Sequence, residues 1–156
     1  MVTPPMIPPA MIELLRTGVS VVVGTRDAAL MPECTRAWGI RIEGDRRTAT
    51  IFLTESISGR TLANLRENGL IAISCTRPTD HVACQLKGRV RTIRPADDRE
   101  REASRRWHRE FVGELVAIGV PGELPSAWIT EPALAVEIDV TDVFHQTPGP
   151  GTGGKV

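Results

Sequence analysis

The sequence predicts a mainly β (α+β) domain in which six antiparallel strands close, or nearly close, into a barrel beside a short and a long helix. The chain has 156 residues, the size of one domain that buries about two-thirds of the surface its unfolded form exposes. Short apolar segments recur along most of it, several with a two-residue period. Because many strands on a short chain leave exposed edges unless they close, a barrel is favoured over an open sheet.

The strands are indicated by apolar runs and by alternation. The expected strands are residues 19–25, 33–43, 48–54, 70–75 and 81–91, and a last one with alternating Leu134, Val136, Ile138 and Val140. In residues 81–91 one face carries Val82, Cys84, Leu86 and Val90, and the other carries His81, Gln85, Lys87 and Arg89. This alternation predicts a half-buried antiparallel strand.

The helices are indicated by their stop signals and by one apolar stripe. Residues 58–68 form the short helix beside the barrel, with Asn68-Gly69 as its stop signal. Residues 95–118 form the long helix, and its stripe is Ala103, Trp107, Phe111 and Leu115. The expected organisation is an N-terminal extension with a short helix at 10–17 (residues 1–18), a barrel domain (19–146) and a flexible Gly/Pro tail (147–156).

Composition argues against several classes of function. Lys plus Arg and Asp plus Glu both total 19, so no basic surface for nucleic acid is indicated. Three cysteines without CxxC spacing and three dispersed histidines predict neither disulfides nor a metal site, and Cys75 and Cys84 are expected in the core. The proline-rich start does not resemble a secretory signal, and no apolar run approaches a membrane span, so a cytoplasmic protein is expected.

The junction between the third strand and the short helix is suited to holding an anion. Ser58 is placed to accept from the backbone N–H of Arg60 or Thr61 as an N-cap, and the remaining N–H groups face outward beside a partial positive charge. Gly59 lets a ligand approach the backbone, Arg60 adds a planar donor, and Thr54 and Thr61 add hydroxyls. The alternative is a well-capped surface helix with a solvated Arg60.

The segment Phe52-Leu-Thr-Glu-Ser-Ile-Ser-Gly-Arg60, followed by Leu62 and Asn64, carries a resemblance to a known family. It is similar to the pyridoxamine 5'-phosphate oxidase-like, FMN-binding split-barrel family. There a strand ending in Thr leads through Ser and basic residues into a short helix, and these residues hold the FMN phosphate. The resemblance assigns that role to Thr54, Ser58 and Arg60, and it covers about half the chain, residues 19–93.

A second match lies on the preceding strand. The family often has an Arg and then a Lys on the strand that lines the flavin, and Arg36-Ala-Trp-Gly-Ile-Arg41 keeps the spacing with Arg in place of Lys. Strict alternation places Arg36 and Arg41 on opposite faces, so a bulge at Gly39 is needed to bring them together. Without a bulge, one of the two is a surface cation. Trp38 is expected either to flank the isoalloxazine ring or to be a half-buried barrel tryptophan.

The strand after the short helix offers a third match. Gln85-Leu-Lys-Gly-Arg-Val90 resembles the family's next strand, although the family's Gln aligns near Ala83. If the polar side with His81, Gln85 and Lys87 faces a cofactor, Gln85 is placed to bond the flavin ring and Lys87 to neutralise its reduced form. If that side faces solvent, these are ordinary surface residues.

The resemblance implies non-covalent FMN at the interface of a homodimer, and hydride or electron transfer from a reduced nicotinamide to a small acceptor. Residues 121–146 differ from the substrate-binding segment of the true oxidases, so the oxidase itself is not expected. No triad or paired carboxylate stands out, so no catalytic residue is assigned. The alternatives are a deazaflavin-dependent reductase and a non-enzymatic protein that holds flavin or haem, with His81, His108 or His145 as the haem ligand.

Overall fold

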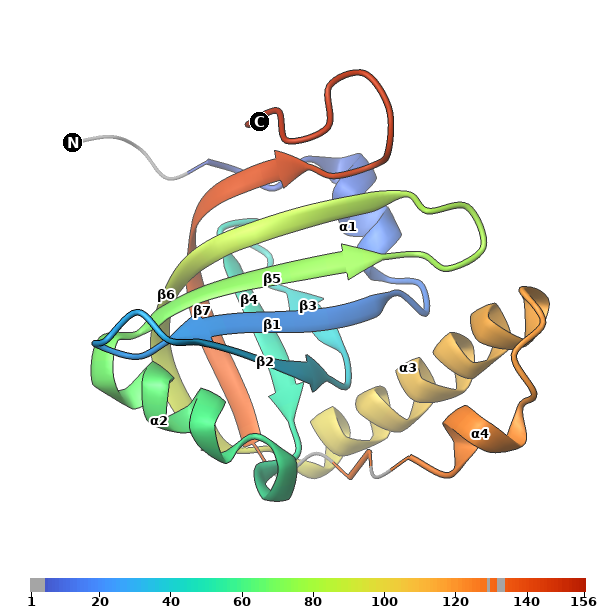
Figure 1. Cartoon of the computed structure of the whole chain (residues 1–156), viewed down its shortest axis with the longest axis horizontal. Coiled ribbons are helices and arrows are strands. Elements are labelled where there is room, and N and C mark those ends of the chain that lie inside the picture. The colour runs from blue at the N-terminus through green and yellow to red at the C-terminus, as the bar shows by residue number, and fades with distance from the viewer. Residues whose placement is uncertain (1–4, 129, 132–133) are drawn as a thin grey trace.

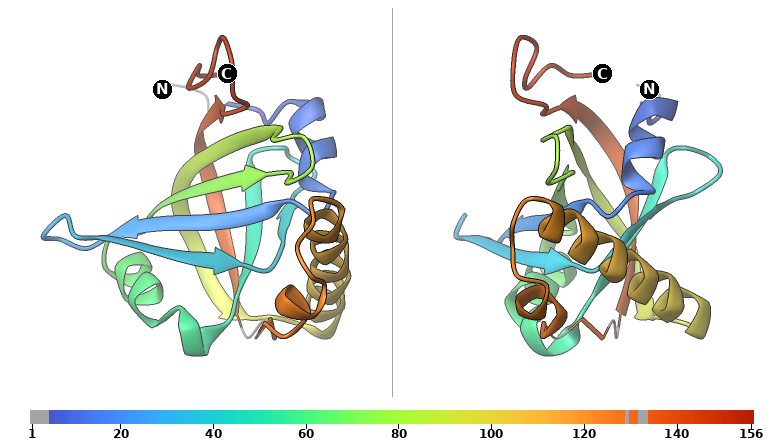
Figure 2. Two further views of the ribbon diagram at one scale, coloured as in Figure 1. Left: turned by 45° about the vertical axis from the view of Figure 1, so that its right-hand side comes forward. Right: turned by 90° about the vertical axis from the view of Figure 1, so that its right-hand side faces the viewer.

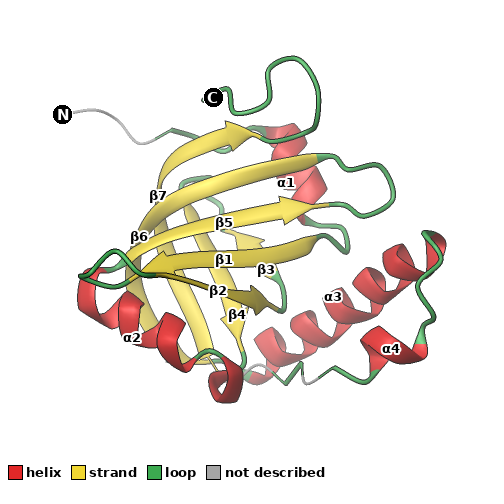
Figure 3. Ribbon diagram, in the orientation of Figure 1, coloured by secondary structure: helices red, strands yellow, loops and turns green. Residues whose placement is uncertain are grey.

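Seven antiparallel strands form one curled sheet in the computed structural model, which describes residues 5–128, 130–131 and 134–156 (Figure 1). The spatial order is β2-β1-β5-β6-β7-β4-β3. The strands are β1 Ser20–Arg26, β2 Pro32–Ala37, β3 Ile40–Ile42, β4 Thr48–Leu53, β5 Leu70–Thr76, β6 Ala83–Pro95 and β7 Leu134–His145. Figure 3 shows the helices outside this sheet, so the predicted mainly β barrel is confirmed.

The strand predicted at residues 33–43 is wrong in one respect, because the structure divides it into β2 and β3. Gly39 has φ +125°, a backbone conformation that residues other than glycine rarely adopt, and this conformation interrupts the strand. The break also closes the barrel: the Trp38 N–H donates to the Phe52 carbonyl at 2.8 Å, and the Phe52 N–H donates to the Gly39 carbonyl at 3.4 Å. The count therefore becomes seven strands rather than six.

Strands β6 and β7 are longer than predicted and pair with each other in the middle of the sheet. β6 begins at Ala83 rather than at 81, because His81 lies in the preceding turn with φ +60°. The register between β6 and β7 shifts at Lys87/Gly88, where a Cβ on Gly88 would lie 2.3 Å from the Asp139 carbonyl oxygen. Only glycine permits this close approach of the two backbones.

The helices are α1 Pro9–Leu15, a short 3-10 turn η1 Glu55–Ile57, α2 Gly59–Asn68, α3 Asp98–Ala117 and α4 Glu123–Ser126. α2 ends at Gly69 in left-handed backbone with φ +70°, as its stop signal predicts. α3 begins three residues later than predicted, because Asp97 caps it and forms a capping box with Glu100. The segment 121–125, predicted only to break the chain, contains the start of α4.

The core fills the barrel and continues under α1 and α3 (Figure 2). The predicted burial of Cys75 and Cys84 is confirmed: they are 0% and 1% exposed, face each other across β5 and β6, and are free thiols. Trp107 and Phe111, from the predicted apolar stripe of α3, are also buried. Within the described residues, no helix is long and apolar enough to cross a bilayer.

The C-terminal segment folds back beside β7. Lys155 forms a β-bridge with Phe144, and the Gly153 N–H donates to the His145 carbonyl at 2.7 Å. Lys155 also pairs with Asp142. These contacts place the segment against the last residues of β7, beyond the part that pairs with β4, and its predicted flexibility stays a prediction.

Candidate functional site

The predicted anion site lies in the connection between β4 and α2. Thr54 follows β4 directly, and its hydroxyl donates to the Glu131 carbonyl at 3.0 Å. η1 then turns the chain, so that Ser58 comes just before the first residue of α2. Thr54, Ser58 and Thr61 are all buried, with exposed fractions of 5%, 1% and 1%. The structure thus brings three predicted hydroxyls to one junction.

The predicted N-cap bond of Ser58 is wrong. Its side chain forms no capping hydrogen bond, and its hydroxyl lies 3.5 Å from the Thr35 hydroxyl on β2 instead. The reason is its backbone: with φ −117° and ψ 16°, Ser58 is not in the extended conformation of a capping residue. In the described part of the chain, no acceptor pairs with the backbone N–H groups of Gly59, Arg60 and Thr61.

Thr61 carries an unpaired hydroxyl beside those N–H groups. Its Oγ1 is buried and has no hydrogen-bond partner among the described residues. Burying a hydroxyl without a partner costs about 1–3 kcal/mol, so such groups are rare unless something else satisfies them. A Cβ built on Gly59 would meet nothing within 4 Å, so the start of the helix is open.

Arg60 adds an exposed positive charge to the same helix start. Its side chain is 74% exposed, and its Nε lies 3.3 Å from the carboxylate of Glu33 on β2. An exposed ion pair of this kind contributes about 0–1 kcal/mol, so a doubly charged phosphate can compete with Glu33 for the guanidinium. The helix start therefore offers three N–H donors, a partial positive charge and an available Arg.

Arg36 lies apart from this junction. Thr35 faces Ser58, and the next residue of a strand points to the other face. The Arg36 guanidinium lies 5.3 Å from the ring centre of Phe111 and 5.4 Å from that of Trp128, and it donates to the Ser20 hydroxyl at 2.8 Å. No carboxylate of the described residues pairs with it, and burial lowers the pKa of Arg36. Phe111 lies on the predicted apolar stripe of α3, but no pattern in the sequence paired it with Arg36 or marked Trp128.

Trp38 is not available as a flat platform. It is 3% exposed and packs edge-on against Trp107 and His108, with ring centres 6.3 and 5.8 Å apart. Its indole N–H has no partner among the described residues. Of the two expectations for Trp38, the structure shows a tryptophan of the barrel, and its side chain is almost fully rather than half buried.

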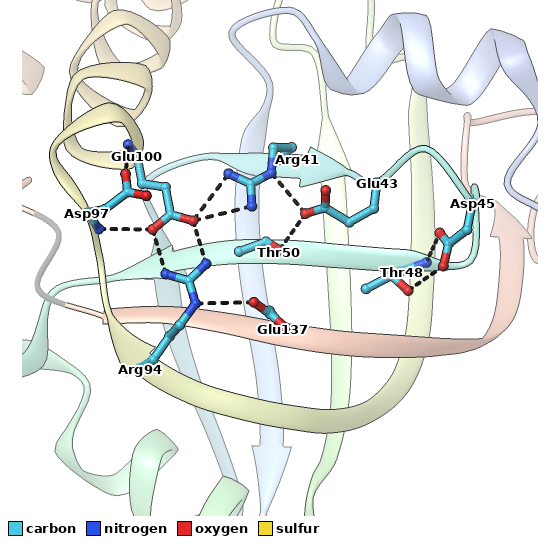
Figure 4. Close-up of polar contacts among 9 residues, drawn as sticks. All are labelled: Arg41, Glu43, Asp45, Thr48, Thr50, Arg94, Asp97, Glu100 and Glu137. Carbon is cyan, nitrogen blue, oxygen red and sulfur yellow. Dashed lines mark hydrogen bonds and ion pairs between the residues drawn. The ribbon is translucent and has the colours of Figure 1, made fainter.

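Arg41 lies in a separate ion network at the start of α3 (Figure 4). Its guanidinium donates to Glu43 at 2.9 Å and to the nearly buried Glu100 at 3.2 Å. Arg94 binds the same Glu100 carboxylate at 2.6 and 2.8 Å. Hydrogen bonds from Arg94, then from the Asp97 backbone N–H and from Arg41, lower the pKa of Glu100 to about 2. The break at Gly39 therefore does not bring Arg36 and Arg41 to shared partners.

Gln85 and Lys87 lie on the outer face of the sheet, as the alternation predicts. Gln85 donates from Nε2 to the Ser74 hydroxyl at 3.1 Å, and the Lys87 ammonium lies 5.1 Å from the Phe144 ring centre. A cavity of about 410 Å³ lies at this face between β1, β5, β6 and β7, and Lys87 lines it. His81, placed on the same face by the sequence, lies outside the strand.

The histidines and other metal-ligating side chains are dispersed. His108 Nε2 lies 3.0 Å from the Pro125 carbonyl oxygen, His81 is in a turn, and His145 ends β7. Across the ranges that the structure covers, no three His, Cys, Asp or Glu side chains gather as a metal site. The interaction of Thr54 with Glu131 has no signal in the sequence, because it joins segments 77 residues apart.

Comparison with known proteins finds the fold but no sequence relative. No protein-family model matches the chain, and neither does any curated protein. HupZ from Group A Streptococcus is 20% identical with a TM-score of 0.60, covering 95% of this chain and 100% of that one. An F420 reductase is 14% identical with a TM-score of 0.58, covering 88% and 98%. An FMN-binding protein from Syntrophomonas wolfei is 14% identical with a TM-score of 0.51, covering 86% and 88%.

At these identities the likeness establishes the fold alone. The resemblance to the pyridoxamine 5'-phosphate oxidase-like split barrels is confirmed at that level.

Proposed function

We propose that this split barrel binds FMN, with the phosphate at the start of α2. The observation that carries the proposal is the set of unpaired donors there: the backbone N–H groups of Gly59, Arg60 and Thr61, and the buried Thr61 hydroxyl. A phosphate is the group that satisfies such a set, because it offers several acceptor oxygens and a negative charge. The FMN-binding protein among the structural neighbours supports this choice of ligand.

Each residue at the junction has a distinct task in this proposal. The three backbone N–H groups hold the phosphate at the positive end of α2, and Arg60 leaves Glu33 to pair with it. Ser58 and Thr61 lie at the base of the site, and Thr54 fixes the strand end by its bond to Glu131. Gln85 and Lys87 are the predicted contacts of the ring on the outer face of the sheet. Arg36, Trp38 and Arg41 have other partners and are not needed for this phosphate.

The reaction we propose is transfer of hydride or electrons from a reduced nicotinamide to a small acceptor. Bound flavin would supply that chemistry, and the chain would bind it, orient it and exclude water.

We also propose that two copies of the chain pair through the outer face of β1 and β5. Val22, Gly24, Ala72 and Ser74 line this face with mostly small, half-buried side chains, and Gly24 and Ala72 also line the cavity of about 410 Å³. Such a face suits either a planar ring or a second sheet.

A deazaflavin is the second candidate cofactor, favoured by the F420 reductase among the neighbours. It also carries a phosphate, so the start of α2 suits it equally, and the two are told apart by which one raises the thermal stability of the protein. A non-enzymatic protein that holds flavin or haem is the remaining alternative. A Soret band in the purified protein would favour haem.

Removing the Arg60 charge tests the site directly. We expect Arg60→Ala to weaken FMN binding by about 1.5–3 kcal/mol, because a charge-assisted contact to phosphate is lost. The matched control is Arg66→Ala, which removes the same charge from the last turn of the same helix and should leave the affinity unchanged. Fluorescence quenching of FMN on titration with each variant gives the affinities. Equal affinities for wild type and Arg60→Ala would place the phosphate elsewhere.

A further inference from the structure

A second cavity lies on a different part of the barrel, between α1, β3 and α3. Figure 2 shows α1 and α3 on the same side of the barrel. The space between them has a volume of about 480 Å³, within the range of small-molecule sites. None of its lining residues belongs to the junction 54–61 or to the outer face with Gln85 and Lys87, so it is independent of the proposed flavin site.

The floor of this cavity is apolar. Ile12 and Leu15 reach it from α1, Ile40 and Phe52 from the sheet, and Trp107 from α3. Trp107 and Phe52 are 7% and 3% exposed, so their positions are fixed by packing. A floor of this kind takes the hydrocarbon part of a ligand.

The rim of the cavity is mainly cationic. Arg16, Arg41 and Arg106 line it, against one carboxylate, Glu110. Arg16 is paired with Glu13, and Arg41 is held by Glu43 and Glu100. Arg106 has no ion-pair or hydrogen-bond partner for its side chain in the described part of the chain, so it is the guanidinium at this rim that remains available. Charge complementarity therefore favours an anionic group at Arg106.

We infer that this cavity binds a small amphipathic carboxylate, with its apolar body on Trp107 and Phe52 and its carboxylate at Arg106. Both parts of the ligand follow from the lining of the cavity. The side chains of its floor are apolar or aromatic, and the indole N–H of Trp107 is buried, whereas the rim has an unpaired planar donor. Glu110, one helical turn from Arg106, disfavours a ligand with a second negative charge close to the first.

Octanoate is a suitable probe, with 1-octanol and acetate as matched compounds that each lack one of its two parts. We expect titration calorimetry to show octanoate binding about fivefold more tightly than 1-octanol and at least tenfold more tightly than acetate, and Trp fluorescence to change with octanoate. Arg106→Ala should weaken octanoate binding about fivefold and leave 1-octanol unchanged, since only the carboxylate contact is lost. Arg109→Ala, which removes a guanidinium that pairs with Glu102 outside the cavity, should have no effect.

A variant that fills the cavity provides a second test of octanoate binding. Ala103 lines it and is half-buried, so Ala103→Phe should abolish octanoate binding while the circular dichroism of the folded protein is retained. If that variant fails to fold, the Arg106→Ala comparison decides alone. Equal affinities for octanoate and 1-octanol, or octanoate binding that neither variant changes, would overturn the inference. Arg60→Ala leaves octanoate binding intact, so failure of the flavin proposal would not mimic failure here.

Discussion

Thr61 is the residue on which the proposed phosphate site depends most. Its hydroxyl is buried and unpaired at the start of α2, so in the absence of a ligand it opposes folding. The N–H groups of Gly59 and Arg60 are also unpaired among the described residues, but these two residues are exposed. A ligand that reaches the Thr61 hydroxyl gains a donor that is already desolvated and fixed in place, which reduces the cost of binding.

Replacing Thr61 by Val should therefore separate stability from binding. We expect Thr61→Val to leave the free energy of unfolding unchanged or to raise it by about 1 kcal/mol, and to weaken FMN binding by about 1 kcal/mol. Urea unfolding and FMN titration of the same variant measure the two effects.

Thr48 provides the contrast, because it is also buried but its hydroxyl donates to Asp45 at 2.7 Å. Thr48→Val should lower the free energy of unfolding by about 1 kcal/mol and leave FMN affinity unchanged. If the two variants behave alike in both measurements, the Thr61 hydroxyl has no special role.

Glu100 determines part of the acid stability of the fold. The folded pKa is lowered to about 2 from an ordinary 4.5, so this group stabilises the fold fully above the ordinary value. The contribution is lost as the pH falls through about 2, and its size is about 3 kcal/mol, because the side chain is only 4% exposed.

Glu100→Gln should remove this pH dependence while keeping a side chain that can accept the capping-box bond. We expect the difference in unfolding free energy between wild type and variant to be largest near neutral pH and to shrink by about 3 kcal/mol between pH 5 and pH 2. Urea unfolding at a series of pH values measures it. A difference independent of pH would show that the Glu100 charge does not stabilise the fold.

Among the secondary-structure elements, strands and helix ends could be predicted where neighbouring residues in the sequence determine them. The alternation of residues 81–91 placed Gln85 and Lys87 correctly on the outer face, and Gly69 ends α2 as predicted. The break at Gly39 was not readable as a strand boundary, because it depends on pairing with Phe52 across the barrel. The same holds for Arg41: its spacing from Arg36 is visible in the sequence, but its partner Glu100 lies 59 residues away.

Gly39, between β2 and β3, is a position where a side chain should destabilise the fold. Gly39→Ala should destabilise the fold by about 1–3 kcal/mol, because φ +125° strains any side chain and the new Cβ would lie 3.2 Å from the Phe52 ring. Gly113→Ala is the matched control: Gly113 is exposed in the middle of α3 with nothing near its Cβ position, so the change should stabilise by about 0.5–1 kcal/mol. Thermal unfolding of both variants checks the opposite signs, and equal signs would contradict the account.

At the scale of the whole molecule, the sequence predicted the barrel and the place of the anion site better than the identity of its ligands. The junction 54–61 is continuous in the chain, so its hydroxyls, glycine and arginine appear together in the sequence. The aromatic partners of Arg36 and the cavity between α1 and α3 are assembled from distant segments, and no local pattern could indicate them.

FMN should stabilise the purified protein against heat if the start of α2 holds its phosphate. If FMN binds the native state at the start of α2, added FMN raises the thermal midpoint, with about 2.7 kcal/mol of stabilisation at a free concentration one hundred times Kd. The same experiment on Arg60→Ala should require a higher FMN concentration for the same shift, whereas Arg66→Ala should match wild type. A colourless protein whose thermal midpoint does not change with FMN would contradict the account.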